Sequence, residues 1–339
     1  MNLESIKPVT ELTNITSKDI SGALLSSETP LLFKGACSNW PIVQKAIQSN
    51  EAAAQHLLSH YTGEPINAFY GEPEINGRVF YNQNMDGFNV NAHQLPLQLV
   101  IEKLLSCQND AKAPTVYMGS TNTARWFPTL ENEHDFTLAN ASPLTSVWLG
   151  NQSKIAAHFD FPTNLACNLA GKRRFLLFPP EQIENLYVGP LEFAPGGQAI
   201  SLVDFENPDF NQFPKFAEAL EHALIAELSP GDILLLPSMW WHQVEAQTGF
   251  NLLLTHWWRD TSAFYGRPDN ALELAILSLR SLPKAQRKAW QALFNYYVFN
   301  DELDSLEHIP EHAKAALTLP LPEQQALKLR ASLLNKLKR

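Results

Sequence analysis

The segment Ala157-His158-Phe159-Asp160-Phe161 combines residue types that suit a metal ion. In a strand, alternate residues face the same side, so the imidazole of His158 and the carboxylate of Asp160 are expected to project together. A carboxylate inside a β enclosure is costly to bury unless a cation or strong donors meet it. The segment 230–242 supplies a third candidate, because His242 directly follows an apolar strand and two tryptophans. Two imidazoles and one carboxylate form the facial arrangement used for non-haem Fe(II) and oxygen chemistry.

Taken alone, a His-x-Asp pair is not specific, because the chain has ten histidines and such a pair also arises by chance. The other histidines show no ligand spacing, and strand alternation predicts a structural role for His256, opposite Thr255. The sequence lacks the short signatures of dinucleotide-binding, nucleotide-binding, zincin and serine-hydrolase sites. Its three cysteines have no C-x-x-C spacing, which favours neither a disulfide framework nor a thiolate zinc site and fits a reducing cytoplasm.

The region from Thr115 to Trp258 is expected to hold these residues in β-structure. The segment Ala170-Gly171 predicts a tight hairpin, and Ser229–Asp232 predicts a turn before another strand. Because regular helices do not separate the runs, the pattern favours an antiparallel sandwich or barrel over a βαβ sheet. Short β-prone runs occur at 115–118, 145–149, 165–169, 174–178, 233–236 and 251–257.

The segments on either side of this region differ in character. Near the N-terminus, Pro30–Gly35 reads as a strand, Trp40-Pro41 as a turn into a helix, and Glu51–Leu58 as helical. After Trp258, apolar residues recur at helical spacing, and Pro283 and Pro322 are each expected at a helix start. The helical stripes are Leu272, Ile276 and Leu279; Trp290, Leu293, Phe294 and Tyr297; and Leu329, Leu333 and Leu337.

The domain organisation follows from this change of period. We predict a body with N-terminal elements over 1–262 and a small helical bundle over 263–339. A few amphipathic helices cannot easily hide their apolar faces alone, so the bundle is expected to dock on the β body, on a second copy as a homodimer, or on both.

The composition limits the partners. The 339 residues are 45% hydrophobic and 18% charged, enough for a substantial core. The net charge of −10 disfavours nucleic acid and anionic membranes. No apolar run approaches the roughly 18 residues of a membrane span, and residues 1–13 do not resemble a secretion signal. A soluble, cytoplasmic protein is expected.

The order of several motifs resembles the JmjC or cupin-like 2-oxoglutarate oxygenases. Asn164, the segment 171–180 and the segment 231–242 follow the His-x-Asp pair in the family's order. The likeness is greatest to the asparaginyl hydroxylase known as factor inhibiting hypoxia-inducible factor and to the tRNA wybutosine-modifying hydroxylase branch. It extends to 30–41, 203–214 and 265–268, and so covers most of the chain.

The resemblance implies a fold, a metal and a cosubstrate. The fold would be a double-stranded β-helix, or jelly roll, mainly β with N-terminal α/β elements and flanking helices. Fe(II) would be held by His158, Asp160 and His242. The iron would bind 2-oxoglutarate and O2, and hydroxylation would be coupled to decarboxylation of 2-oxoglutarate to succinate and carbon dioxide.

The resemblance also implies which residues bind 2-oxoglutarate. Arg173 would meet its far carboxylate where relatives usually have lysine, and arginine can do so through two parallel N–H bonds. Ile155 replaces a usual threonine, and Thr255 stands where many relatives have asparagine. Tyr117 and Asn164 match pocket residues of the family.

Other roles for these residues remain open at the level of sequence. Arg173 could lie at the solvated tip of a hairpin, and Tyr117 could be a core aromatic. Tryptophans 240, 241, 257 and 258 are expected to pack in the core or at its rim.

The expected function is hydroxylation of a protein or peptide side chain, with an RNA nucleoside as the weaker substrate and lysine demethylation weaker still. A second hypothesis is a metal-binding, cupin-like interaction protein that uses 2-oxoglutarate poorly, because three pocket residues are altered. A third, a cupin of small-molecule metabolism, predicts more histidine ligands than the His-x-Asp pair provides.

Overall fold

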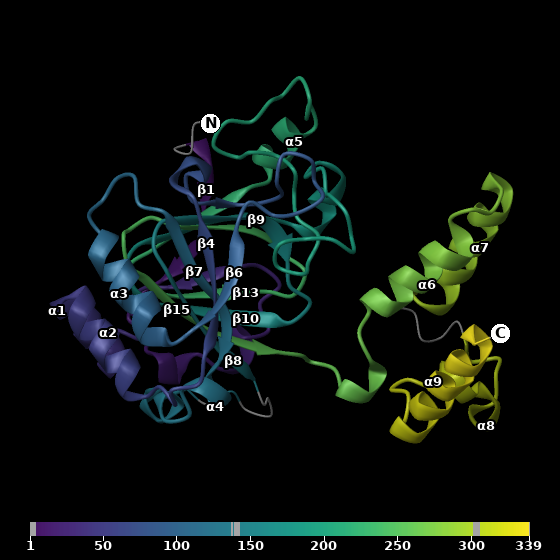
Figure 1. The fold of residues 1–339 in the computed structure, drawn as a ribbon. Helices are drawn as coiled ribbons and strands as arrows, with labels where there is room; N and C mark the ends of the chain where they lie inside the picture. Colours follow the sequence, from purple (N-terminus) through teal and green to yellow (C-terminus); the bar gives the residue numbers. More distant parts are fainter. Residues whose placement is uncertain (1–4, 137, 139–142, 301–305, 339) are drawn as a thin grey trace. The chain divides into compact units, whose positions relative to one another are not determined.

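The computed structural model describes residues 5–136, 138, 143–300 and 306–338. The chain divides into two units, Met1–Arg259 and Asp260–Arg339. The first unit is built on β-sheets and the second on helices (Figure 1).

Two mixed sheets form the first unit. One has the order β1-β12-β11-β14-β9-β5, and the other β2-β3-β13-β10-β15-β8-β7-β4-β6. The strands of the smaller sheet are β1 (Lys7–Pro8), β5 (Arg78–Val79), β9 (Ser153–Phe159), β11 (Arg173–Phe178), β12 (Leu224–Leu228) and β14 (Trp241–Ala246). Those of the larger sheet are β2 (Thr10–Leu12), β3 (Leu31–Phe33), β4 (Ile66–Gly71), β6 (Asn91–Leu95), β7 (Thr115–Asn122), β8 (Leu144–Gly150), β10 (Thr163–Ala170), β13 (Ile233–Leu236) and β15 (Asn251–Trp258).

Strands β8 to β15 form the jelly roll, four from each sheet, and this confirms the expected double-stranded β-helix. Along this stretch every connection passes from one sheet to the other, except the one between β11 and β12. The predicted strands over 115–257 all occur, with ends shifted by a few residues.

The hairpin predicted at Ala170-Gly171 is wrong. Strand β10 pairs with β13 and β15, whereas β11 pairs with β12 and β14, so the turn joins two sheets. Gly171 has a φ of +75°, and an added Cβ would lie 2.5 Å from the carbonyl oxygen of Phe250. A glycine is required at this position because the chain crosses from one sheet to the other here, and not because of a hairpin turn.

The two faces of strand β10 have different surroundings. Leu165, Cys167 and Leu169 join the main core, which contains apolar residues of three helices. Asn164 and Ala166, on the opposite face, point into a cavity between the sheets. Alternation along one strand thus separates the core from the cavity.

Helices α1 (Pro41–Gln48), α2 (Asn50–Ser59) and α3 (Leu97–Cys107) share that core, through residues such as Ile42, Leu57 and Leu104. The predicted strand near residue 31 and the predicted helices after 40 and over 51–58 are confirmed. Shorter helices of this unit are α4 (Thr123–Trp126) and α5 (Phe216–Glu221), with 3-10 turns η2 (Ser17–Asp19), η3 (Gly22–Leu24), η4 (Pro73–Ile75), η5 (Leu130–Glu133) and η6 (Pro180–Glu184).

The second unit is helical, as its sequence period indicates. Pro283 and Pro322 immediately precede two of its helices, in the N-cap position, which confirms both predicted starts. Its helices are α6 (Asp269–Leu279), α7 (Lys284–Tyr297), α8 (Glu311–Lys314) and α9 (Glu323–Leu337), with 3-10 turns η7 (Ala263–Tyr265) and η9 (Ala315–Leu317). Within the described residues, none of the helices has both the length and the apolar character needed to cross a membrane.

Candidate active site

His158, Asp160 and His242 come together between β9 and β14. His158 and His242 are direct partners in the antiparallel register of these strands, with ring centroids 4.4 Å apart. Asp160 follows the end of β9, and its Oδ2 lies 3.8 Å from Nε2 of His242. One ligand atom of each residue lies within 4.8 Å of the other two. The sequence predicted that His242 comes directly after a strand. In the structure it is instead the second residue of strand β14.

Hydrogen bonds orient all three side chains. Nδ1 of His158 lies 2.9 Å from the carbonyl oxygen of Ala156, and Nδ1 of His242 lies 3.0 Å from that of Trp240. We assign the proton of each ring to Nδ1, because a carbonyl can only accept, and this leaves Nε2 free to bind a metal. Nε2 of Gln198 donates to Oδ1 of Asp160 at 3.1 Å. Both imidazoles therefore present a lone pair toward the carboxylate.

The turn before β14 is attached to the backbone beside Asp160. The amide of Met239 donates to the carbonyl oxygen of Asp160 at 2.9 Å, and the hydroxyl of Ser238 donates to that of Phe161. Met239 adopts a left-handed φ of 69°, which is uncommon for a residue with a side chain. These bonds couple the segment that carries His242 to the one that carries the other two side chains.

The electrostatics of His242 favour its neutral form. Burial, and then the nearby His158, lower the pKa of His242 to about 4, against the opposing effects of Asp160 and of the hydrogen bond with Trp240. A neutral imidazole is the form that ligates a metal. At neutral pH this side chain needs no proton release before it binds an ion.

A cavity of about 540 Å³ adjoins the three side chains. Apolar and aromatic side chains form much of its wall, which is typical of sites that exclude water from a small ligand. Every residue that the sequence assigned to the site lines this cavity: Tyr117, Ile155, His158, Asp160, Asn164, Arg173, His242 and Thr255.

Arg173 points inward and is only 6% exposed, so it is not at a solvated hairpin tip. Its Nε donates to Oδ1 of Asn168 at a long 3.4 Å. Burial lowers the pKa of Arg173 to about 10, so it remains charged at neutral pH. Among the described residues no carboxylate forms an ion pair with it, whereas its outward neighbour Arg174 pairs with Glu227 and Glu245. A buried cation of this kind fits an anionic ligand.

The other cavity residues have different hydrogen-bonding states. Thr255 accepts from Nε1 of Trp148 at 2.9 Å, so its hydroxyl is already engaged by the protein. Oδ1 of Asn164 is buried without a hydrogen-bond partner among the described residues. Tyr117 is half-buried, and burial raises its pKa, which the charge of Arg173 counteracts. The unpaired amide oxygen is a further sign that a ligand completes the cavity.

Gln198 is a cavity residue that contacts the site and that the sequence did not reveal. It belongs to an irregular stretch with no pattern that marks it. Trp257 is half-buried and lines the cavity, which fits the expected place at the rim of the core, and its Nε1 has no partner among the described residues. Strand alternation from Thr255 places it on this face. The expectation is also correct for Trp240, Trp241 and Trp258, which lie in three separate cores.

His256 lies outside the cavity, as alternation predicts. Its Nδ1 is 3.1 Å from Oγ1 of Thr145, and its ring contacts those of His134 and Phe136. A second cluster, His56, His60 and Glu133, also lies outside the cavity. His56 lies in the predicted helix 51–58 and His60 follows it by two residues, and this four-residue spacing is the signal that marks the pair.

Comparisons with known proteins agree with this architecture. A family model described as a cupin-like domain matches residues 17–264. Human HSPB1-associated protein 1 is 29% identical over 150 residues, which cover 43% of this chain and 30% of the relative. Chicken (Gallus gallus) tRNA wybutosine-synthesizing protein 5 is 29% identical over 145 residues, which cover 38% of this chain and 42% of the relative. Lysine-specific demethylase JMJ31 of Arabidopsis thaliana is 23% identical over 284 residues, which cover 72% of this chain and 48% of the relative. The matches thus span less than half the length of these relatives.

Proposed function

The chain belongs to the cupin-like domain family, and from this premise we propose that it is an Fe(II)- and 2-oxoglutarate-dependent dioxygenase that hydroxylates a protein or peptide side chain. One observation carries the proposal. The candidate ligands His158, Asp160 and His242 open into the same cavity as Arg173, a buried cation that forms no ion pair among the described residues.

The donor set fits Fe(II). Two neutral imidazole nitrogens and one carboxylate on one side of an ion leave the remaining positions for small ligands. When bound, Fe(II) would supply the reaction of O2 with 2-oxoglutarate that oxidises the substrate. The residues themselves hold and orient: the carbonyls of Ala156 and Trp240 fix the two rings, and Gln198 fixes one oxygen of Asp160.

The rest of the cavity fits 2-oxoglutarate. Arg173 would bind the far carboxylate, and the unpaired Oδ1 of Asn164 and the hydroxyl of Tyr117 would border the cosubstrate. Thr255 would act mainly by fixing Trp148, because its hydroxyl already accepts from that indole. Ile155 adds apolar wall where a hydroxyl is usual in relatives. The arginine therefore carries most of the charge recognition.

A protein or peptide is the substrate class that we favour. The net charge of −10 opposes the binding of a polyphosphate chain. One relative is named for tRNA wybutosine synthesis and another for demethylation of lysine, so RNA and methylated peptides belong in the same test.

The test measures succinate. The 339-residue chain is incubated aerobically with Fe(II) and 2-oxoglutarate, together with peptides, methylated peptides or total RNA. Succinate is measured together with the oxygen atom gained by a hydroxylated substrate, or with the formaldehyde released from a demethylated one. We expect peptide-dependent succinate release that is lost in Asp160→Ala. Succinate release that depends on RNA would contradict the peptide assignment and make RNA the substrate class. Tight iron binding without any succinate would support the alternative of an interaction protein.

We also propose that the second unit forms a homodimer. Large apolar side chains on its helices are at least one-third exposed when this unit is considered by itself. They include Leu272, Leu277, Trp290, Leu293, Tyr297, Leu333 and Leu337. A second copy would bury such faces symmetrically.

A further inference from the structure

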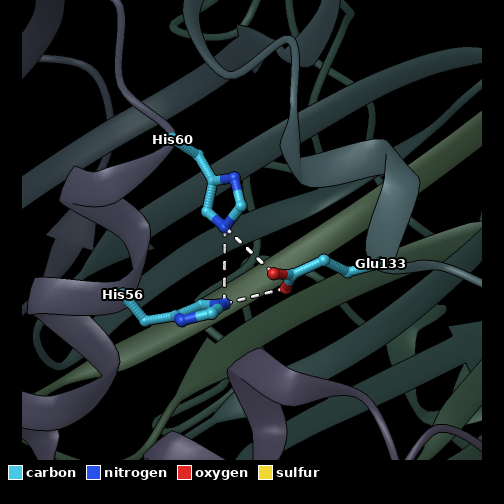
Figure 2. Close-up of side chains that lie close together, drawn as sticks. All are labelled: His56, His60 and Glu133. Atoms are coloured by element: carbon cyan, nitrogen blue, oxygen red, sulfur yellow. Dashed lines mark hydrogen bonds and ion pairs between the residues drawn. The ribbon is translucent and has the colours of Figure 1, made fainter.

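His56, His60 and Glu133 form a compact cluster on a part of the first unit that does not line the cavity (Figure 2). His56 lies in α2, and His60 directly follows the last residue of that helix. His60 keeps right-handed helical backbone angles, so the four-residue spacing places both imidazoles on one face. Glu133, the last residue of η5, reaches the pair although it is 77 residues away from His56 in the sequence.

The three ligand atoms surround one point. Nε2 of His56 is 2.8 Å from Oε2 of Glu133, and Nε2 of His60 is 3.2 Å from Oε1. The two Nε2 atoms are 3.4 Å apart. Two imidazole nitrogens bound at about 2.0–2.1 Å to one tetrahedral ion are separated by about 3.3 Å, so the observed spacing matches a shared ion.

The outer contacts of His60 also suit a metal. Its Nδ1 lies 2.7 Å from Oγ1 of Thr129. A ring that donates its Nδ1 proton to this hydroxyl has a free lone pair at Nε2, directed at the other members of the cluster. Without an ion, the two oxygens of Glu133 can accept one N–H from each ring, but the two Nε2 atoms still lie 3.4 Å apart with no bond between two N–H groups. A single cation satisfies both nitrogens and the carboxylate.

The burial of the cluster allows an ion to enter and to stay. The side chains are 16%, 12% and 19% exposed for His56, His60 and Glu133. Among the described residues, no lysine or arginine forms an ion pair with Glu133, so its charge is not already neutralised by a permanent cation. The partial exposure leaves room for water as a fourth ligand.

We infer that His56, His60 and Glu133 form a second, structural metal site for a divalent ion of the zinc type. Two imidazoles and one carboxylate are ligands that zinc accepts. The ion would tie α2 to η5. The residues after η5 reach the core, because His134 stacks on Trp40 at 4.3 Å and Asp135 accepts from the indole of Trp40 at 2.8 Å. Fixing η5 therefore fixes this part of the link from β7 to β8. The inference does not depend on the proposed enzymatic activity.

The experiment uses the 339-residue chain in which Asp160→Ala and His242→Ala remove the candidate iron site. Zn(II) is titrated against a chromophoric chelator, and Co(II) is used as a spectroscopic probe. We expect one equivalent of Zn(II), a visible Co(II) spectrum typical of four-coordination, and a rise in melting temperature with zinc. Adding His56→Ala and His60→Ala should abolish all three. Thr129→Val should weaken zinc about 10- to 100-fold.

His93→Ala is the matched control, because His93 is exposed on β6 and lies outside the cluster. It should leave zinc binding unchanged. If the background variant does not fold, the wild-type chain should bind two equivalents of Zn(II) and the His56→Ala, His60→Ala chain one. Equal stoichiometry with and without the two histidines, or zinc binding that survives their removal in the background variant, overturns the assignment.

Discussion

His158 and His242 face each other across β9 and β14, and each ring has Nδ1 within 3.0 Å of the carbonyl oxygen two residues before it in the chain. The two rings are therefore held by the same device in both strands. The two Nε2 atoms and the carboxylate of Asp160 are therefore the atoms that face the candidate metal position.

Asp160→Ala should remove iron binding while it leaves the fold intact. The side chain supplies the only charged group of the three, and even contacts outside a ligand set are worth about 10- to 100-fold in metal affinity, so we expect a loss greater than about 100-fold. Iron content after anaerobic loading measures the effect, and circular dichroism checks the fold. Asp260→Ala, at an exposed position, is the control. Full iron occupancy in the Asp160 variant would contradict the ligand assignment.

Arg173→Ala should weaken 2-oxoglutarate much more than iron. Removing one partner of a buried charge pair costs about 2–5 kcal/mol, so the affinity for N-oxalylglycine, an unreactive analogue, should fall at least about 30-fold. Calorimetry with Mn(II)-loaded protein measures it. Arg174→Ala is the matched control, because Arg174 points outward to Glu227 and Glu245. Unchanged affinity in the Arg173 variant would refute its role as the anchor.

Buried His256 should make the first unit less stable as the pH falls. Its pKa lies well below 6.5, mainly because of burial and then because of the neighbouring His134. Below about pH 6.5 the unfolded chain binds a proton that the native imidazole refuses, so stability is full above that pH and is lost as the pH decreases, by up to about 1.4 kcal/mol per unit. His256→Gln should make this dependence shallower. Urea unfolding at pH 7.5, 6.5 and 5.5 tests it, and identical slopes would contradict it.

The apolar helices of the second unit should determine the oligomeric state. We expect the full chain to sediment at twice its 38.0 kDa mass. Trp290→Asp with Leu293→Asp places charges among exposed apolar side chains of α7 and should give monomers with unchanged helix content. Lys288→Asp, a charge change on the same helix, should not. A wild-type monomer at micromolar concentration would refute the dimer.

Much of the fold and of the candidate site followed from local sequence signals. The strands over 115–257 were predictable because β-branched and apolar runs end at turn residues. His158 and Asp160 were found because a spacing of two places both on one side of a strand. Arg173, facing inward beside an outward Arg174, also follows the alternation of its strand once the starting side is known.

The remaining features depend on contacts that no local pattern encodes. The turn at Gly171 marks a change of direction, but nothing in its residues reveals that the chain moves to the other sheet. Gln198 reaches Asp160 from an irregular segment, and Glu133 reaches His56 across 77 residues. Such pairings are decided by how the layers stack, which is a property of the whole core.

The link between β11 and β12, residues 179–223, is where the jelly roll leaves a sheet and returns to the same one, and it contributes Gln198. Because this link starts and ends in the same sheet, its length does not set the spacing of the two layers, and its exposed part around Gln198 can change while Leu186, Phe205 and Phe216 keep their core packing. The residue that contacts the Asp160 carboxylate, now Gln198, can therefore be exchanged without altering the strands of the jelly roll. A protein engineer who wishes to change the specificity of the site should begin with this stretch.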